Sequence, residues 1–278
     1  MTEFEILFLE RYPDKGLLLE YMKDALMKEL NFHDITKTDL ERVVRFIRAS
    51  VASNSARTYC AHIKSFMLRH QEKMKSLGKD WTDILTVRKE STIFVTLNEN
   101  EIKRLIKYAI NEEGYPMENR CVAMFCVSAI TGARYSDMIN LKGAILKAGE
   151  VFSYVSEKTK IRAEILVAKS LPLLLSKITK VHRRDILNRN IKNVCRKLGF
   201  KSPSRVFRGG VASTGEKWEF VSSHTARRSF ATNMWKQGAD LEYISLMMGH
   251  ASYNQTKGYI NSSIEDVSDN IKNLFNNY

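Results

Sequence analysis

The sequence predicts a mainly α-helical protein of two domains, the second of which also contains a small β-hairpin. Its 278 residues, 44% of them hydrophobic, are enough for two cores. Apolar residues recur at helical spacing along much of the chain, whereas residues 150–170 combine Val, Ile, Phe and Tyr with a basic turn. We therefore expect an all-helical domain over residues 1–76, a linker over 77–95, and an α+β domain over 96–278 whose residues 260–278 form a C-terminal tail.

The strong positive charge indicates a polyanionic partner. Forty-four Lys and Arg against 31 Asp and Glu give a formal net charge of +13, which favours nucleic acid first and a membrane surface second. No stretch approaches the roughly 20 apolar residues of a membrane span, and acidic residues near the N-terminus argue against a secretory signal. We expect a cytoplasmic protein that binds DNA and no membrane.

The cysteines and most histidines give no sign of a metal or cofactor site. Four cysteines form no C-x-x-C pair and are expected to be reduced core residues of a cytosolic protein, namely Cys60, Cys121, Cys126 and Cys195. Four histidines lack metal-ligand spacing and are interpreted as surface or phosphate-contacting residues, namely His33, His62, His70 and His182. Residues 210–217 (GVASTGEK) nearly match a phosphate-binding loop, but Glu216 stands at the lysine position, so no nucleotide site is expected.

The N-terminal domain is expected to contain at least three helices and a basic surface. One helix covers residues 17–30, a second is capped by Thr36 or Thr38, and a third begins at Ser53 or Ser55. Between residues 45 and 75 there are seven Lys or Arg and one acidic residue. Such a run is often only a solvated face, but its alternation with Ser and Thr suits phosphate contacts. The DNA-contact candidates here are Arg45, Arg57, Lys64 and Lys75.

A buried helix leads to the first charged candidate of the second domain. Residues 119–130 form a strongly apolar helix, and Gly132 can turn the chain sharply at its end. Arg134 then emerges from a buried helix end, where a charge rarely lies without a partner. Asp137, three residues further on, is the expected partner. A structural Arg–Asp pair that caps the next helix is a compatible explanation.

Two further basic segments are candidates for DNA contact. Residues 150–157 and 163–170 predict a hairpin whose tip, residues 158–162, is basic, although these are ordinary turn residues on the plainer interpretation. Residues 180–208 hold ten Lys or Arg and one acidic residue, and include a helix with one apolar stripe that Gly199 ends. The candidates from these segments are Lys160, Arg162, Arg183, Arg184, Arg189 and Lys192.

Residues 222–259 predict three short helices that carry polar groups where a core would normally lie. A serine caps the first, residues 240–249 form the second, and Ser252 with Gln255 is expected to form a capping box for the third. Tyr259 is expected two turns into the third helix.

Four side chains of this stretch suit attack on a phosphodiester. His224 and Arg227 are one helical turn apart and point the same way, and His250 follows a helix end. Arg is the best partner for charge that builds on non-bridging phosphate oxygens. A Tyr hydroxyl, as at Tyr259, has an ordinary pKa of about 10 and needs a base or cationic surroundings to become a nucleophile, and His can move protons near neutral pH. His250 alone is explained as a core histidine and Arg227 alone as a surface arginine, but the four residues together favour phosphoryl transfer.

With these residues the chain resembles the tyrosine recombinases, the family of phage-type integrases and chromosome-dimer resolvases. Residues 131–134 (TGAR) are similar to its T-G-x-R box, residues 224–227 (HTAR) to its H-x-x-R box and residues 248–250 (MGH) to its L-G-H, with Tyr259 nine residues later. The resemblance covers residues 95–270. It extends weakly to the N-terminal helices, which are similar to the family's core-binding domain.

The resemblance implies a DNA strand transferase that needs neither metal nor ATP and forms a 3′-phosphotyrosyl intermediate. The residues that it implies as catalytic are Arg134, Lys158, His224, Arg227, His250 and Tyr259. Tyr259 would be the nucleophile, the two arginines would bind the non-bridging oxygens, and Asp137 would support Arg134.

The remaining catalytic roles implied by the resemblance are proton transfers and a phosphate contact. His224 would exchange a proton with the nucleophile, and His250 would hydrogen-bond the phosphate. A hairpin lysine would protonate the leaving 5′-oxygen, and the family pattern favours Lys158 over Lys160 for this role.

The resemblance also implies double-stranded DNA as partner and a homotetramer on two DNA sites. The C-terminal tail carries an apolar stripe over residues 264–275, which would pack on a neighbouring protomer or dock on its own domain. A type IB topoisomerase or a hairpin telomere resolvase would use the same residues. A non-catalytic DNA-binding regulator is the other alternative, and it would be expected to lack Tyr259 or an arginine.

Overall fold

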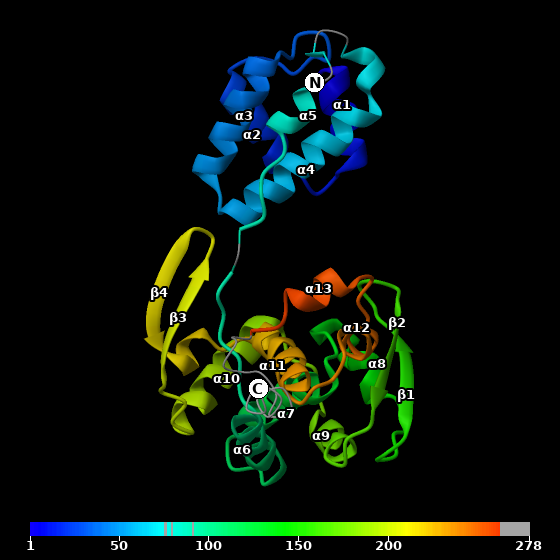
Figure 1. Ribbon diagram of the computed structural model, residues 1–278, viewed down its shortest axis with the longest axis vertical. Helices are drawn as coiled ribbons and strands as arrows, with labels where there is room; N and C mark the ends of the chain where they lie inside the picture. The colour runs from blue at the N-terminus through cyan, green and yellow to red at the C-terminus, as the bar shows by residue number, and fades with distance from the viewer. Residues whose placement is uncertain (75–76, 79, 91, 262–278) are drawn as a thin grey trace, which may run out of the picture. The chain divides into compact units, whose positions relative to one another are not determined.

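The computed structural model describes residues 1–74, 77–78, 80–90 and 92–261, which divide into two compact units (Figure 1). The first unit contains Met1–Thr92 and Phe207–Ala212, and the second contains Ile93–Val206 and the chain from Ser213 onward. Both units are mainly helical, with two small two-stranded sheets along the chain. The predicted fold class is therefore confirmed.

The first unit is built from helices that enclose one aromatic-rich core. Its helices are α1 (Glu3–Arg11), α2 (Gly16–Leu26), α3 (Lys37–Ser50), α4 (Ser53–Arg69) and α5 (Trp81–Ile84), with the 3-10 turn η1 (Gln71–Lys73). Thr36 caps α3 in a reciprocal capping box with Asp39, which satisfies backbone N–H groups at the helix start. Phe4 and Phe8 pack edge-on against Phe66 across this core.

The first unit differs from its sequence-based prediction at two places. Helix α2 ends at Leu26 rather than near residue 30, because Met27 adopts a left-handed conformation with φ 52°. Residues 77–95 were expected to be a linker, but they contain α5, whose Trp81 is buried in the N-terminal core together with Leu77 and Leu85. The packed part of the first unit therefore continues past residue 76.

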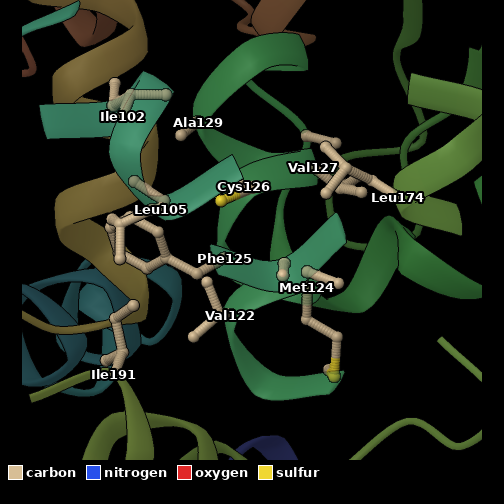
Figure 2. Close-up of a cluster of buried hydrophobic side chains, with 14 of the residues drawn as sticks. Ile102, Leu105, Val122, Met124, Phe125, Cys126, Val127, Ala129, Leu174 and Ile191 are labelled. Carbon is tan, nitrogen blue, oxygen red and sulfur yellow. The ribbon is translucent and has the colours of Figure 1, made fainter. Parts of the chain in front are cut away.

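The second unit is organised around the buried helix α7 (Pro116–Thr131). Proline at its first position is compatible with a helix start, and most of its side chains are inaccessible to solvent. Figure 2 shows Val122, Phe125 and Cys126 of α7 among side chains from neighbouring helices. The other helical elements are α6 (Glu99–Ile110), η3 (Tyr135–Asp137), α8 (Met138–Lys142), α9 (Leu171–Lys177), α10 (Arg184–Lys197), η4 (Lys217–Phe220), α11 (Ser223–Lys236), α12 (Leu241–Met248) and α13 (Tyr253–Lys257).

Two antiparallel hairpins complete the chain. Strands β1 (Val151–Val155) and β2 (Arg162–Leu166) pair in the predicted hairpin, with Tyr154 opposite Ala163 on its buried face. Strands β3 (Pro203–Arg208) and β4 (Val211–Glu216) form a second hairpin that the sequence analysis did not predict. Gly209 and Gly210 join them with φ 60° and 81°, the positive values that a tight two-residue hairpin turn needs.

Several expectations about individual residues and segments can be compared with this fold. All four cysteines are buried and free, as predicted. His182 is also buried, at 7% exposure, and accepts a hydrogen bond from Arg120, so its interpretation as a surface residue is wrong. None of the described helices is long and apolar enough to cross a membrane. The predicted apolar stripe of the tail, residues 264–275, lies outside the described residues.

Candidate active site

The C-terminal stretch folds into three short helices, as predicted, but its last part differs in detail. Ser222 caps α11, and Gly249 ends α12. Ser252 precedes α13 without a side-chain capping bond, so the expected capping box with Gln255 is absent. Tyr259 lies just beyond α13 rather than inside it, because its backbone N–H bonds to the carbonyl of Thr256 in a tighter turn.

Two glycines turn helix C-termini towards the site. Gly132 ends α7 and Gly249 ends α12, with φ 71° and 59° in the left-handed region that favours glycine. A Cβ on Gly132 would lie 2.7 Å from the Phe230 ring, so this position also has no room for a side chain. Carbonyls at such helix ends lack helical partners and carry partial negative charge, which suits them to receive cations.

Arg227 is the most deeply buried positive charge of the site, with 2% exposure. Its Nη1 donates to the carbonyl of Gly132, and its Nη2 donates to Met248 O at 3.1 Å and to His250 Nε2 at 2.8 Å. Its Nε is buried and has no hydrogen-bond partner within the described part of the chain. Burial and the neighbouring Arg134 lower the pKa of Arg227 to about 10, so the guanidinium stays charged at neutral pH.

Arg134 is half-buried beside the same helix end. Its Nη1 donates to Ser156 Oγ at 2.8 Å, and it has longer contacts of 3.4 Å with Met248 O and Gly249 O. The carbonyl groups at the end of α12 therefore serve both arginines. This shared set of acceptors holds two positive charges close together, an arrangement that a bound anion would stabilise.

Asp137 supports Arg134 through an intermediate residue. Its buried carboxylate accepts bonds from the backbone N–H of Arg134 at 3.2 Å, from Glu157 N at 2.8 Å and from Ser156 Oγ at 3.3 and 3.4 Å. Ser156 thus links the carboxylate to the guanidinium, and the direct side-chain pair expected from the sequence is absent among the described residues. The same carboxylate anchors the start of the β1–β2 turn, which carries Lys158.

His250 is buried between Arg227 and helix α13. Because a guanidinium can only donate, Nε2 of His250 must accept from Arg227, and Nδ1 then carries the proton and donates to Thr256 Oγ1 at 2.9 Å. Burial, together with the charges of Arg227 and Arg134, lowers the pKa of His250 to about 3. The imidazole is therefore neutral throughout the physiological range.

Tyr259 lies among these groups. Its hydroxyl is 3.4 Å from His224 Nε2, and its ring lies 5.0 Å from the His250 ring and 5.4 Å from the Arg227 guanidinium carbon. His224 is exposed and Tyr259 is half-buried, so both are open to solvent at this point. The structure thus brings five of the six sequence-predicted catalytic residues, Arg134, His224, Arg227, His250 and Tyr259, into one cluster.

The sixth, Lys158, lies at the tip of the β1–β2 hairpin. Its side chain is exposed and has no hydrogen bond or ion pair among the residues that the structure describes. Lys160 is also exposed, but it adopts a positive φ of 54° and pairs with Glu157 at 3.0 Å. Lys158 is therefore the less restrained of the two.

The DNA-contact candidates lie mostly on the surface. The exposed ones are Arg45, Arg57, Lys160, Arg162, Arg183, Arg184 and Arg189, and the half-buried ones are Lys64 and Lys192. Arg162 and Arg183 form ion pairs with nearby acids, and Lys64 donates to Thr86 Oγ1. Lys75 lies outside the described residues.

Four hydroxyl residues of the site were missed by sequence reasoning. They are Ser156, Thr159, Ser245 and Thr256. Thr159 donates to Gly249 O at 3.2 Å, and Thr256 contacts both His250 and Ser245. Ser156 lies just before the predicted basic tip and Thr159 lies within it, so their place in the hairpin was a usable signal. Ser245 and Thr256 had no such signal in the sequence, because they lie on separate helices and meet only in the folded chain.

This arrangement can carry out phosphoryl transfer. Two guanidinium groups share the carbonyl of Met248, one of them lies against the Tyr259 ring, and a histidine lies next to the tyrosine hydroxyl. Such cationic surroundings favour a phosphate ligand. The described residues contain no group of three or more His, Cys, Asp or Glu placed to hold a metal ion.

Comparison with known proteins identifies the class. A family model described as the phage integrase family matches residues 95–265, more than half of the chain, and the chain therefore belongs to that family. It is a tyrosine recombinase, a DNA strand-exchange enzyme of site-specific recombination. The resemblance inferred from the sequence motifs is thereby confirmed.

The similar proteins include tyrosine recombinases of bacteria. Tyrosine recombinase XerD of Oceanobacillus iheyensis is 25% identical over 252 residues, which are 87% of this chain and 82% of the relative. Tyrosine recombinase XerC of Pelobacter propionicus is 25% identical over 245 residues, or 84% of this chain and 76% of the relative.

Solved structures of DNA-bound recombinases share the fold. The integrase of transposon Tn1549 in complex with transposon right end DNA aligns with a TM-score of 0.65 at 11% identity, covering 98% of this chain and 99% of that one. A lambda integrase dimer bound to a COC′ core site aligns with a TM-score of 0.58 at 17% identity, covering 91% and 94%.

Proposed function

We propose that this recombinase cleaves and rejoins DNA through a covalent bond between Tyr259 and a 3′-phosphate. The phenolic oxygen of Tyr259 attacks the scissile phosphorus, an O–P bond forms, and the bond from phosphorus to the 5′-oxygen breaks. The phenolic proton passes to His224, and Lys158 gives a proton to the leaving 5′-oxygen. Attack by the 5′-hydroxyl of a partner strand reverses these steps, so the link conserves the energy of the phosphodiester.

Arg134 and Arg227 stabilise the charge on the non-bridging oxygens in this mechanism. Arg227 Nε is buried without a partner in the described chain, and Arg134 has mostly long contacts of 3.4 Å, so both retain donor capacity for a phosphate. Asp137 keeps Arg134 in place through Ser156. His250 contacts the phosphate from beside Arg227.

The observation that carries this proposal is the position of the Tyr259 hydroxyl. It lies 3.4 Å from a potential base, His224 Nε2, and its ring lies 5.4 Å from a buried guanidinium. Tyr253, the neighbouring candidate, is exposed on α13, and none of the contacts found among the described residues joins it to these groups.

We further propose the organisation of the protein on DNA. Residues 1–76, together with the packed helix α5, contribute a core-type DNA-binding domain and residues 96–278 the catalytic domain, and the basic residues of both contact double-stranded DNA in the cytoplasm. Four protomers on two DNA sites would provide the partner strands. The net charge of +13 and the DNA-bound relatives, one of them a dimer, support the partner and an oligomer.

A nicked DNA duplex tests the chemistry directly. If the target site carries a nick next to the scissile phosphate, the released fragment diffuses away and the covalent protein–DNA adduct accumulates. Wild type should form this adduct, and Tyr259→Phe should bind the same DNA without forming it. Adduct formed equally well by Tyr259→Phe would contradict the proposal. Relaxation of supercoiled DNA that lacks any target site would instead favour a type IB topoisomerase.

A further inference from the structure

A chain of buried hydroxyl groups leads away from the imidazole of His250. Its Nδ1 lies 2.9 Å from Thr256 Oγ1, and Thr256 Oγ1 lies 2.9 Å from Ser245 Oγ. All three residues are buried, with exposures of 8%, 0% and 4%. Buried polar groups of this kind depend on one another for hydrogen bonds, because no solvent replaces a lost partner.

The direction of each hydrogen bond in the free protein follows from Arg227. Its Nη2 can only donate, so His250 Nε2 accepts and the neutral ring carries its proton on Nδ1. Nδ1–H then donates to Thr256 Oγ1, which leaves the threonine's own hydrogen for Ser245 Oγ. In the free protein, hydrogen-bond donation therefore runs from the imidazole to the threonine and from the threonine to the serine.

A phosphate ligand requires the opposite order. To contact an anionic oxygen, Nε2 of His250 has to donate, and Arg227 Nη2 has to turn from the ring to the phosphate. A neutral ring protonated on Nε2 has a bare Nδ1, which needs a donor. A hydroxyl can rotate from acceptor to donor in place, whereas a backbone carbonyl or carboxylate cannot.

We propose that Thr256, backed by Ser245, is a positioning residue that lets His250 exchange tautomers when the scissile phosphate binds. Nδ1 releases one proton to solvent and Nε2 takes one up, so the ring stays neutral. The hydroxyl hydrogens of Thr256 and Ser245 rotate, and the chain then runs from serine to threonine to imidazole. This inference rests on the proposed roles of His250 and Tyr259.

Thr256 also ties this exchange to the nucleophile. Its carbonyl accepts the backbone N–H of Tyr259 at 2.9 Å, so one residue holds the phosphate-binding histidine by its side chain and the tyrosine segment by its backbone. Removing only the hydroxyl separates the two roles, because the backbone bond survives a side-chain substitution.

The tautomer itself can be measured without any change at Thr256. In protein labelled with ¹⁵N-histidine, the free form should show His250 protonated on Nδ1, and the complex of Tyr259→Phe with target DNA should show it protonated on Nε2. Protonation on Nδ1 in both states, or a doubly protonated ring in the complex, would overturn the proposal.

Variants test the role of the hydroxyl in catalysis. Thr256→Val should slow adduct formation at saturating DNA by about tenfold or more, as removal of a group that orients a functional histidine does. Thr256→Ser should restore most of the rate. In a His250→Phe background, which lacks ring nitrogens, Thr256→Val should cause no further loss, because the two residues act in one step.

Thr232→Val is the matched control. The Thr232 hydroxyl accepts from Asn261 N at 3.0 Å and lies 3.4 Å from Tyr259 O, so it holds the nucleophile segment without touching His250. In the double variant, the fold-reduction in rate caused by Thr232→Val should multiply with the fold-reduction caused by His250→Phe. If the losses of Thr256→Val and His250→Phe also multiply while Tyr259→Phe forms no adduct, the present inference fails and the proposed function stands. Adduct formation by Tyr259→Phe would instead remove the proposed function.

Discussion

Nη2 of Arg227 and Nε2 of His250 lie 2.8 Å apart in a buried contact, and the guanidinium is the donor. The contact is incompatible with a proton on Nε2, so it favours the neutral imidazole. Burial is the largest cause of this preference, and burial together with the charges of Arg227 and Arg134 lowers the pKa of His250 to about 3. The contact therefore has a measurable consequence for stability.

We expect the protein to lose stability as the pH falls below about 6.5. The unfolded chain protonates His250 near its ordinary pKa, whereas the folded chain resists protonation until about pH 3, so folding is progressively disfavoured across this window. At pH 5 the loss from this residue is about 2 kcal/mol. Thermal unfolding of wild type and His250→Gln at pH 7.5 and pH 5 measures it. The variant should lose less stability between these two values, and an equal loss would show that His250 is not held neutral.

Replacement of Lys158 should impair only the step that needs a proton on the leaving group. Lys158→Ala should slow cleavage of an ordinary site, because its free side chain at the hairpin tip is the proposed acid. A 5′-bridging phosphorothioate leaves without protonation, so it should restore cleavage in this variant. Lys160→Ala is the control and should cleave both substrates like wild type when the DNA is saturating. If the phosphorothioate instead rescued cleavage by Lys160→Ala, the residue that protonates the leaving group would be Lys160.

Removal of the Ser156 hydroxyl should misplace Arg134. Ser156 accepts from Nη1 of this arginine and donates to Asp137, so Ser156→Ala leaves the guanidinium held mainly by long contacts. Small displacements of a catalytic group cost up to about 100-fold in rate, and we expect a fall of about 10- to 100-fold in adduct formation at saturating DNA. Ser153→Ala, at an exposed position of strand β1 three residues before Ser156, is the matched control. Equal rates of adduct formation in the two variants would show that Ser156 does not position Arg134.

Charge reversal on the basic surfaces should change how salt affects binding. Arg57 on α4 and Arg189 on α10 are exposed and have no ion-pair partner among the described residues. Arg57→Glu or Arg189→Glu should weaken DNA binding and flatten the dependence of log K on log salt by about one unit for each phosphate that the variant no longer binds. Lys103→Glu, in a residue that pairs with Glu99 outside both basic runs, is the control. If the variants show the same slope of log K against log salt as wild type, these basic segments do not contact phosphates and are only solvated surfaces.

Local signals in the sequence located much of the fold and the site. Gly132 marked the sharp end of a buried helix, Thr36 was one of the two expected caps of the next N-terminal helix, and segments rich in Val, Ile, Phe and Tyr around a basic turn marked the first hairpin. Arg134 and Arg227 could be selected because each stands within a short motif. In each case the information lies within a few residues of the feature.

Features that depend on contacts between distant segments were missed. Asp137 stands three residues from Arg134, yet its carboxylate reaches the guanidinium only through Ser156, some 20 residues further along the chain. Thr256 looked like an ordinary residue of a short helix until the fold placed it against His250. The second hairpin had only Gly209 and Gly210 as its signal, because its strands lack a clear apolar alternation.

Identification of the residue that carries the DNA tests the central proposal most directly. The adduct trapped on a nicked site can be digested with nuclease and protease, and the nucleotide-bearing peptide sequenced by mass spectrometry. The proposal predicts the nucleotide on Tyr259, linked through its 3′-phosphate, in every modified peptide. A nucleotide on Tyr253 or on any other residue, or a 5′-phosphate linkage, would contradict it.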